Sequence, residues 1–365
     1  MEGGGMVCKC RKGLYPLKIA GIVIIFSSIL LSPLVSRGYV VKKDGKIVLQ
    51  YSDHTPPITP VARAAMQWQK VITEKTGGRI EFQNAFAGAL LKEDEIFRGI
   101  EKGIADIAWY PVNPRDGFLL STLPLLPFLG WPNREAALKI YEELFRKFPA
   151  MQNEWRTVKI VSISFMPPTH FHMAINRLLK KPHDIRGLKI ATTGEHTNII
   201  KALGATPVEI PIGDWYTALE RRVVEGCLNH FGVAFTFKFL ELLKTHTLFG
   251  EGGINITPVF MIMNLETWNK LPREVQEVFD ASEVRRTWTY TMWDLEEKET
   301  LIAAIEYCKQ NKHQLYYLSE TELAEWRNAV KKQVHDKWME EGAKRGLPAK
   351  QLYDEAMKLI SSAHK

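Results

Sequence analysis

Two histidines separated by one residue, His170 and His172, are the pair in this 365-residue chain whose types and spacing most directly suggest chemistry. On a β-strand they would share one face, a spacing that can ligate a metal ion together with Asp53 or His196. Alternatively, one of them carries a proton and binds an anion, and binding then weakens as the pH rises past its pKa. Because a lone H-x-H is far more often structural, we predict no metal site and no cofactor.

We find no common catalytic motif in a sequence context where it could act. The nucleophile patterns G-x-S-x-G and S-x-x-K, the zinc-protease pattern H-E-x-x-H, the P-loop and the Rossmann glycine pattern do not stand where they could act. We therefore predict that the chain is not an enzyme. Of the four cysteines, Cys227 and Cys308 lie far apart in the body of the chain, and we expect buried thiols there rather than a disulfide framework.

The net charge of +7 is concentrated at the N-terminus, where residues 1–38 carry +4 and leave only +3 on the rest. No basic stripe with interleaved aromatic residues occurs, so we predict no nucleic-acid partner. The basic residues precede an apolar run, Ile19–Val35, and small residues at Ser36 and Gly38 fit cleavage after Gly38. We expect a cleaved signal peptide and a periplasmic protein, with an uncleaved membrane anchor as the alternative.

The elements that would position functional residues alternate between strands and helices. In the first part, the pattern predicts parallel β-α-β units and then a long loop, Pro111–Pro132. The predicted elements are strands at Ile47–Tyr51, Arg79–Gln83, Ile104–Tyr110, Val158–Phe165, Phe171–Asn176, Leu188–Ala191 and Val259–Asn264, and helices at Thr59–Lys75, Glu93–Lys102, Glu195–Leu203 and Trp215–Val223.

The last part of the chain is predicted to be helical. From Pro272 to Asn311 an apolar periodicity runs without proline or glycine, which predicts one helix on the order of 55 Å long. Ser319–Glu322 is a capping box that opens another helix, and a last helix follows Pro348. Asp214 is placed to cap the helix that begins at Trp215. Two α/β lobes crossed by the chain several times predict a hinged binding protein, with its ligand at the carboxyl ends of the strands.

The segment Lys181–Phe231 resembles the signature of solute-binding proteins of TRAP (tripartite ATP-independent periplasmic) transporters. Three further pieces in the right order extend the resemblance over roughly Ile47 to Arg345: Thr76–Arg79, Gly88–Asp106 and Asn264–Pro272. The matching residues of the signature are Asp184, Gly187, Leu188, Lys189, Ile190, Leu203, Gly204, Ala205, Pro207, Tyr216, Ala218, Leu219, Gly226 and Asn229.

The resemblance implies a two-lobed periplasmic binding protein fold with a long helix crossing both lobes. It also implies a receptor that takes up a small organic solute and delivers it to the subunits of a TRAP membrane permease. We assign residues 1–38 to the signal or anchor, 39–168 and 257–296 to lobe I, 169–256 and 297–347 to lobe II, and 348–365 to a C-terminal helix. A membrane-anchored sensor and a receptor of another transporter class remain alternatives, and the oligomeric state is not predicted.

The resemblance also places a ligand site. The family's carboxylate-binding arginine should stand at Ala191, and a second basic position of some members aligns with Phe171, or in another register with His170 or His172. Since an arginine fork is the usual partner of a buried carboxylate, we expect an atypical ligand. It would be aromatic, amphipathic or neutral, or an acid held by Thr192, Thr193 or a histidine. The other expected ligand-binding residues are Asp53, His54, Trp109, Tyr110, Ile212, Trp215 and Asn229.

Overall fold

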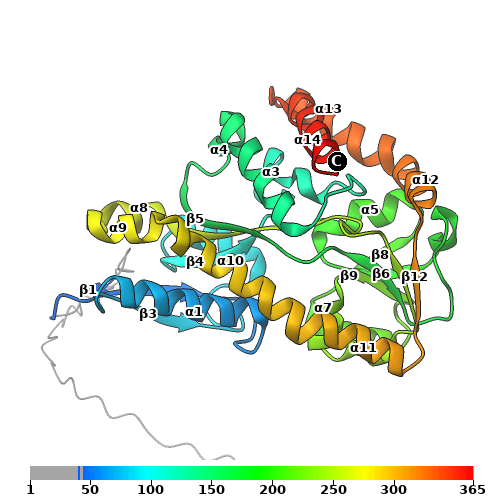
Figure 1. Ribbon diagram of the computed structural model, residues 1–365, viewed down its shortest axis with the longest axis horizontal. Helices are drawn as coiled ribbons and strands as arrows, with labels where there is room; N and C mark the ends of the chain where they lie inside the picture. The colour runs from blue at the N-terminus through cyan, green and yellow to red at the C-terminus, as the bar shows by residue number, and fades with distance from the viewer. Residues whose placement is uncertain (1–39, 42–43, 365) are drawn as a thin grey trace, which may run out of the picture. The chain divides into compact units, whose positions relative to one another are not determined.

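Two mixed β-sheets with flanking helices organise this computed structural model, which describes residues 40–41 and 44–364 (Figure 1). The predicted α/β class is confirmed. The predicted signal peptide or anchor, residues 1–38, lies outside the described residues. Among the helices that are described, none is long and apolar enough to cross a membrane.

The first sheet confirms the predicted parallel β-α-β arrangement at its centre. Strand β2 is parallel to both β3 and β4, while β11 returns antiparallel between β4 and β5. All seven residues of β11 are buried, as expected for an apolar strand covered on both faces. The strands are β1 (Val40–Val41), β2 (Ile47–Ser52), β3 (Ile80–Ala85), β4 (Ile107–Pro111), β5 (Val158–Phe165) and β11 (Pro258–Asn264).

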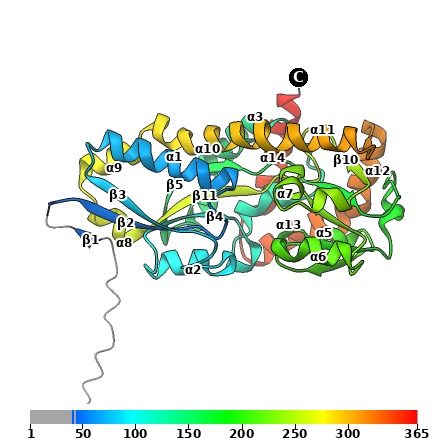
Figure 2. The same ribbon diagram turned by 90° about the horizontal axis from the view of Figure 1, so that it is seen from below.

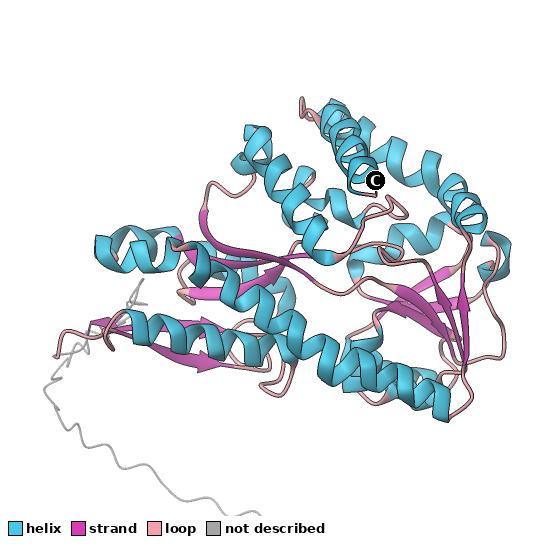
Figure 3. Cartoon of the chain, in the orientation of Figure 1, coloured by secondary structure: helices cyan, strands magenta, loops and turns pink. Residues whose placement is uncertain are grey.

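The second sheet has the order β12-β10-β6-β9-β7-β8. Strand β7 is parallel to β8 and β9, and β6 is antiparallel to β9 and β10. Figure 3 shows the two sheets as separate groups of strands. The strands are β6 (His170–Met173), β7 (Lys189–Thr192), β8 (Thr206–Glu209), β9 (Gly226–Asn229), β10 (Thr245–Leu248) and β12 (Gln314–Tyr317).

The helices largely follow the sequence pattern. The Ser319 capping box opens α12, as predicted, and α1 begins after Thr59, whose side chain caps it. Asp214, in contrast, makes no capping hydrogen bond, because its backbone is already helical. The α-helices are α1 (Pro60–Lys75), α2 (Ile96–Glu101), α3 (Arg134–Lys147), α4 (Pro149–Asn153), α5 (Thr197–Ala202), α6 (Trp215–Glu220), α7 (Phe231–Thr236), α8 (Leu265–Lys270), α9 (Arg273–Asp280), α10 (Ser282–Glu296), α11 (Ile302–Gln310), α12 (Glu320–Val330), α13 (Lys337–Lys344) and α14 (Ala349–Ala363).

The long helix crosses both lobes but is shorter than predicted. The chain is extended at Ala281 (φ −59°, ψ 131°), which separates α9 from α10. Asp280 and Ser282 flank this break, and both residue types favour helix ends over interiors. Helix α10, the π-helical turn Glu297–Leu301 and α11 then run on without interruption for roughly 44 Å (Figure 2). Helix α10 packs on α1 and β5, whereas α11 packs on α7 of the second lobe.

Three apolar clusters form the cores of the two lobes. One surrounds the first sheet, and two others lie against the second sheet, with Ile190 in one and Ala191 in the other. The final helices join the lobes: Trp326 of α12 packs in a second-sheet cluster, while Trp338 of α13 and Leu352 of α14 pack in the first-sheet cluster. Helix α14 lies against α3.

Candidate functional site

A cavity of about 380 Å³ lies between the two sheets, and we call it the interlobe cavity. Segments that follow or end β2, β4, β7 and β9 contribute to its wall, so it stands at the carboxyl ends of parallel strands, where ligands bind in folds of this kind. The long helix closes one side with Glu296 and Thr300. Its apolar wall residues include Val61, Trp109, Met166, Ile212, Val233 and Phe237.

Five of the residues expected to contact the ligand line this cavity: His54, Trp109, Thr193, Ile212 and Asn229. Three others lie directly behind the wall. Asp53 accepts a hydrogen bond from Trp109 Nε1 (2.8 Å), His172 Nε2 lies 3.0 Å from the carbonyl oxygen of Asn229, and Thr192 bonds to the carbonyl of Thr193 (2.9 Å).

The remaining five residues expected in the site do not line the cavity. Tyr110 is buried in the first core, where its hydroxyl donates to Asp116. His170 accepts from the backbone N–H of Phe249 (3.3 Å). The other three, Phe171, Ala191 and Trp215, are fully buried in the second-sheet clusters. Successive strand residues face opposite sides of a sheet, so Trp109 reaches the cavity while Tyr110 points into the core.

Asp53 orients the aromatic wall of the cavity. Its carboxylate accepts hydrogen bonds from Tyr51 Oη (3.0 Å), from Thr55 N (2.8 Å) and Oγ1 (2.6 Å), and from Trp109 Nε1. Burial raises the pKa of Asp53, and these donors oppose that effect by stabilising the charged form. The His54 ring packs on Trp109 with 4.4 Å between ring centroids. The indole is therefore held in one orientation from both sides.

The histidines of the cavity are neutral at physiological pH. Burial lowers the pKa of His54 to about 3, of His230 to about 3 and of His196 to about 4. The pKa of His170 is lowered to about 3 for the same reason. These shifts oppose the hypothesis that a protonated histidine replaces the arginine, because each ring loses its charge well below pH 7.

Three buried polar atoms of the cavity wall have no hydrogen-bond partner among the described residues: His54 Nδ1, Thr193 Oγ1 and His230 Nδ1. Leaving such atoms unpaired costs free energy, which a bound polar group can recover. Asn229 Oδ1 already accepts from the backbone N–H of His230 (2.8 Å), so its NH₂ group is the donor that it can offer. The cavity thus combines an apolar wall with a few neutral polar groups.

Sequence reasoning missed the ion pair between Arg134 and Glu296. Glu296 lines the cavity and lies 2.5 Å from the Arg134 guanidinium, and both side chains are largely buried. Burial raises the pKa of Glu296 to about 7, although Arg134 opposes the shift. One signal was available: Glu296 follows Met292 by four residues and so shares the buried face of the helix. In its charged form, Glu296 neutralises the buried Arg134 guanidinium.

His170 and His172, which the sequence offered as a possible but not expected metal-ligating pair, bond to other groups. His172 Nδ1 contacts His246 Nδ1 at 2.8 Å, and its Nε2 faces the Asn229 carbonyl. His170 Nδ1 is bonded to the Phe249 backbone. In the part of the chain that the structure describes, the grouping of His170 and His172 with Asp53 or His196 is therefore not a ligand set.

Residues 51–341 match the model of the bacterial extracellular solute-binding protein family 7, and the chain belongs to this family. Receptors of the family bind small organic solutes outside the cytoplasm and work with TRAP membrane permeases, so the protein is a solute receptor and not an enzyme. The interpretation drawn from the resemblance is confirmed at this level.

Known proteins that resemble the chain differ in their cargo. A solute-binding protein of Verminephrobacter eiseniae is 26% identical over 58% of this chain and 62% of its own length. The C4-dicarboxylate-binding periplasmic protein DctP of Rhodobacter capsulatus is 24% identical over 80% of this chain and 87% of that protein. A solved TRAP solute-binding protein from an unidentified marine microbe, specific for aromatic acids and bound to 3-hydroxybenzoate, aligns with a TM-score of 0.76, 24% identity and coverage of 88% and 99%. At that identity, the likeness to the solved structure shows the fold.

Proposed function

We propose that this receptor captures a small aromatic solute with a polar substituent in the interlobe cavity and delivers it to a TRAP permease. The observation that carries the proposal is the composition of the cavity wall, in which Trp109 and Phe237 face the same space as the unpaired polar atoms of His54, Thr193 and His230. An aromatic ring fills an apolar cavity of this size, and the polar substituent satisfies the buried groups.

The charge of the solute follows from the cations around the cavity. Among the residues that line it, Lys92 is basic and exposed, no arginine is present, and the histidines are neutral. A hydroxylated or otherwise neutral aromatic compound is therefore preferred to a dicarboxylate, which would need two paired cations. The aromatic acid bound by the marine protein supports the proposal that the solute contains an aromatic ring. An aromatic acid whose carboxylate is held by neutral donors is the second form of the proposal, and the experiment must distinguish it from a neutral aromatic solute.

The test is a calorimetric comparison of 3-hydroxybenzyl alcohol, 3-hydroxybenzoate and succinate, which separates the ring from the carboxylate. We expect both aromatic compounds to bind and succinate not to bind. Phe237→Ala should weaken the binding of the aromatic compounds by roughly 10- to 100-fold, because it removes one large apolar contact. Phe235→Ala is the matched control, since Phe235 lies only two residues away in the chain and does not line the cavity. Succinate binding tighter than both aromatic compounds would refute the proposal.

The location and the lobe limits belong to the same proposal. Residues 1–38 direct export, with cleavage after Gly38, and the receptor acts in the periplasm. N-terminal sequencing of the exported protein distinguishes cleavage from a retained anchor. Lobe I comprises 39–168 and 257–296, lobe II 169–256 and 297–347, and the C-terminal helix 348–365. The separate sheets and the passage of the long helix between them support this division.

A further inference from the structure

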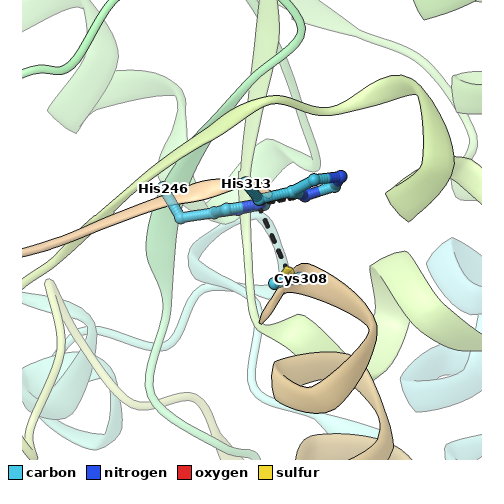
Figure 4. A group of neighbouring side chains, drawn as sticks. All are labelled: His246, Cys308 and His313. Atoms are coloured by element: carbon cyan, nitrogen blue, oxygen red, sulfur yellow. Dashed lines mark hydrogen bonds between the residues drawn. The ribbon is translucent and has the colours of Figure 1, made fainter. Parts of the chain in front are cut away.

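Three potential metal ligands converge in the second lobe, away from the interlobe cavity. They are His246 on β10, Cys308 on α11 and His313 in the turn before β12, and their ligand atoms all lie within 4.8 Å of one another (Figure 4). His246 Nε2 is 3.0 Å from His313 Nδ1 and 3.5 Å from Cys308 Sγ. In tetrahedral Zn²⁺ sites, two nitrogen ligands stand about 3.3 Å apart and a nitrogen and a sulfur about 3.6 Å apart.

The hydrogen bonds behind His246 fix which of its nitrogens faces this cluster with a lone pair. The Asn229 carbonyl can only accept, so His172 Nε2 carries a proton and donates to it (3.0 Å). His172 Nδ1 is then unprotonated and accepts from His246 Nδ1–H (2.8 Å). His246 Nε2 must therefore present its lone pair to Cys308 and His313. A histidine ligand whose other nitrogen donates a hydrogen bond is the usual arrangement in metal sites.

The turn after α11 brings the other two ligands together. His313 N–H donates to the carbonyl of Cys308 (2.9 Å), and between them Lys312 adopts a left-handed conformation (φ 58°) that a lysine rarely takes. His246 and Cys308 are fully buried, whereas His313 is half-buried and leaves a route from solvent. Two imidazoles and one thiolate are a donor set that suits Zn²⁺, with the fourth position open to water.

We propose that His246, Cys308 and His313 form a Zn²⁺ site that ties the end of α11 to strands β10 and β12 of the second lobe. Burial raises the pKa of the Cys308 thiol to about 12, so the metal-free thiol is protonated. Binding replaces that proton with the metal ion, and the proton leaves to solvent. The two imidazoles bind as neutral rings.

The first test uses the full chain carrying C8S and C10S, so that no Zn²⁺ taken up can be ascribed to these two further thiols. After removal of metals with a chelator, titration with ZnCl₂ should show one ion bound per chain. Replacement by Co²⁺ should produce the thiolate-to-metal charge-transfer absorption of a tetrahedral cysteine site. A chain that takes up no Zn²⁺, or a Co²⁺ adduct without this absorption, would overturn the proposal. Neither measurement depends on whether a variant folds.

The second test assigns the ligands. Cys308→Ser and His313→Gln should each weaken Zn²⁺ binding by more than about 100-fold, and His172→Gln, which removes only the support of His246, by roughly 10- to 100-fold. Matched controls are Cys227→Ser, the other buried thiol, and His183→Gln, an exposed histidine. Both controls should bind as the parent does. Equal losses in the controls and in the ligand variants would place the ion elsewhere and refute the assignment.

Discussion

Single residues decide what charge the interlobe cavity offers a solute. Ala191, where the resemblance calls for an arginine, is fully buried in the same apolar cluster as Trp215 and Phe231. A guanidinium at this position would be buried among apolar groups unless its side chain reached the cavity. Arg134, which lies behind the cavity wall, is already paired with the lining residue Glu296. The charge offered to a solute carboxylate therefore depends on that pair.

Replacing Glu296 with glutamine should change which solutes bind. The Glu296→Gln variant keeps the shape of the side chain but leaves the Arg134 charge uncompensated beside the cavity. A charge-assisted hydrogen bond is worth about 1.5–3 kcal/mol. The affinity for 3-hydroxybenzoate relative to that for 3-hydroxybenzyl alcohol should therefore rise by roughly 10- to 100-fold at pH 8. Calorimetry of both compounds measures the ratio. Glu299→Gln is the control, because Glu299 pairs with Arg63 and does not line the cavity. An unchanged ratio in Glu296→Gln would contradict the role given to the pair.

The same pair gives the wild-type protein a pH dependence. The pKa of Glu296 is raised to about 7, so the carboxylate becomes protonated as the pH falls below 7 and Arg134 loses its partner. The preference for the aromatic acid should therefore rise between pH 8 and pH 6 in the wild type. It should stay constant over this range in Glu296→Gln, which has no group to protonate.

At the scale of elements, the sequence predicted those strands and helices that a clear apolar periodicity or a capping motif marks. The first three strands, helix α1 and the Ser319 capping box stand where the pattern placed them. Strand β10 was missed, because three of the four residues of Thr245–Leu248 are polar and an apolar alternation is absent. The break at Ala281 was missed since neither proline nor glycine marks it. Both features depend on tertiary packing, which local pattern does not record.

The residues of the candidate site were predicted from the expected ends of strands, and the success of the prediction is limited by how precisely a strand end can be placed. A strand end identifies the right place, so Trp109 and Asn229 line the cavity. It does not identify which of two neighbouring side chains faces the ligand, and so Tyr110 was included. Glu296, Cys308 and His313 lie on helices or in a turn distant in sequence from those strand ends, and His246 lies on the missed strand β10. Only the packing of the long helix across both lobes brings them into place.

Contacts between elements of the two lobes should affect solute release. Arg115, which follows β4 of the first sheet, forms an ion pair with Glu209 of β8 in the second sheet, so the pair links the two lobes. Both side chains are exposed, and such pairs are worth about 0.2–1 kcal/mol. Arg115→Gln should therefore speed solute dissociation by roughly 1.4- to 5-fold at low salt and by less at high salt, as measured by stopped-flow fluorescence. Arg79→Gln, which removes an exposed pair with Glu274 inside the first lobe, should leave the rate unchanged. A similar change in both variants would count against the link between lobes.

At the scale of the whole molecule, buried neutral histidines dominate the pH dependence of stability. Burial lowers the pKa of His54, His170 and His230 to about 3 and of His196 to about 4. In the unfolded chain these rings titrate near 6.5. Their contribution to stability is therefore complete above pH 6.5 and is lost as the pH falls toward the folded-state values. Each ring accounts for about 3–5 kcal/mol over its full range.

These contributions outweigh the opposite effect of Glu296, whose raised pKa favours the folded state by about 3 kcal/mol at low pH. Because the four histidines titrate in the same direction, the free energy of unfolding should fall as the pH drops below 6.5. Urea unfolding followed by tryptophan fluorescence should show a free energy of unfolding that is flat from pH 8 to 7 and falls steeply below. His54→Gln should reduce the slope by one proton relative to the parent protein. A stability that stays constant down to pH 4.5 would mean that these rings are hydrated in the folded protein and that the interlobe cavity is open to water.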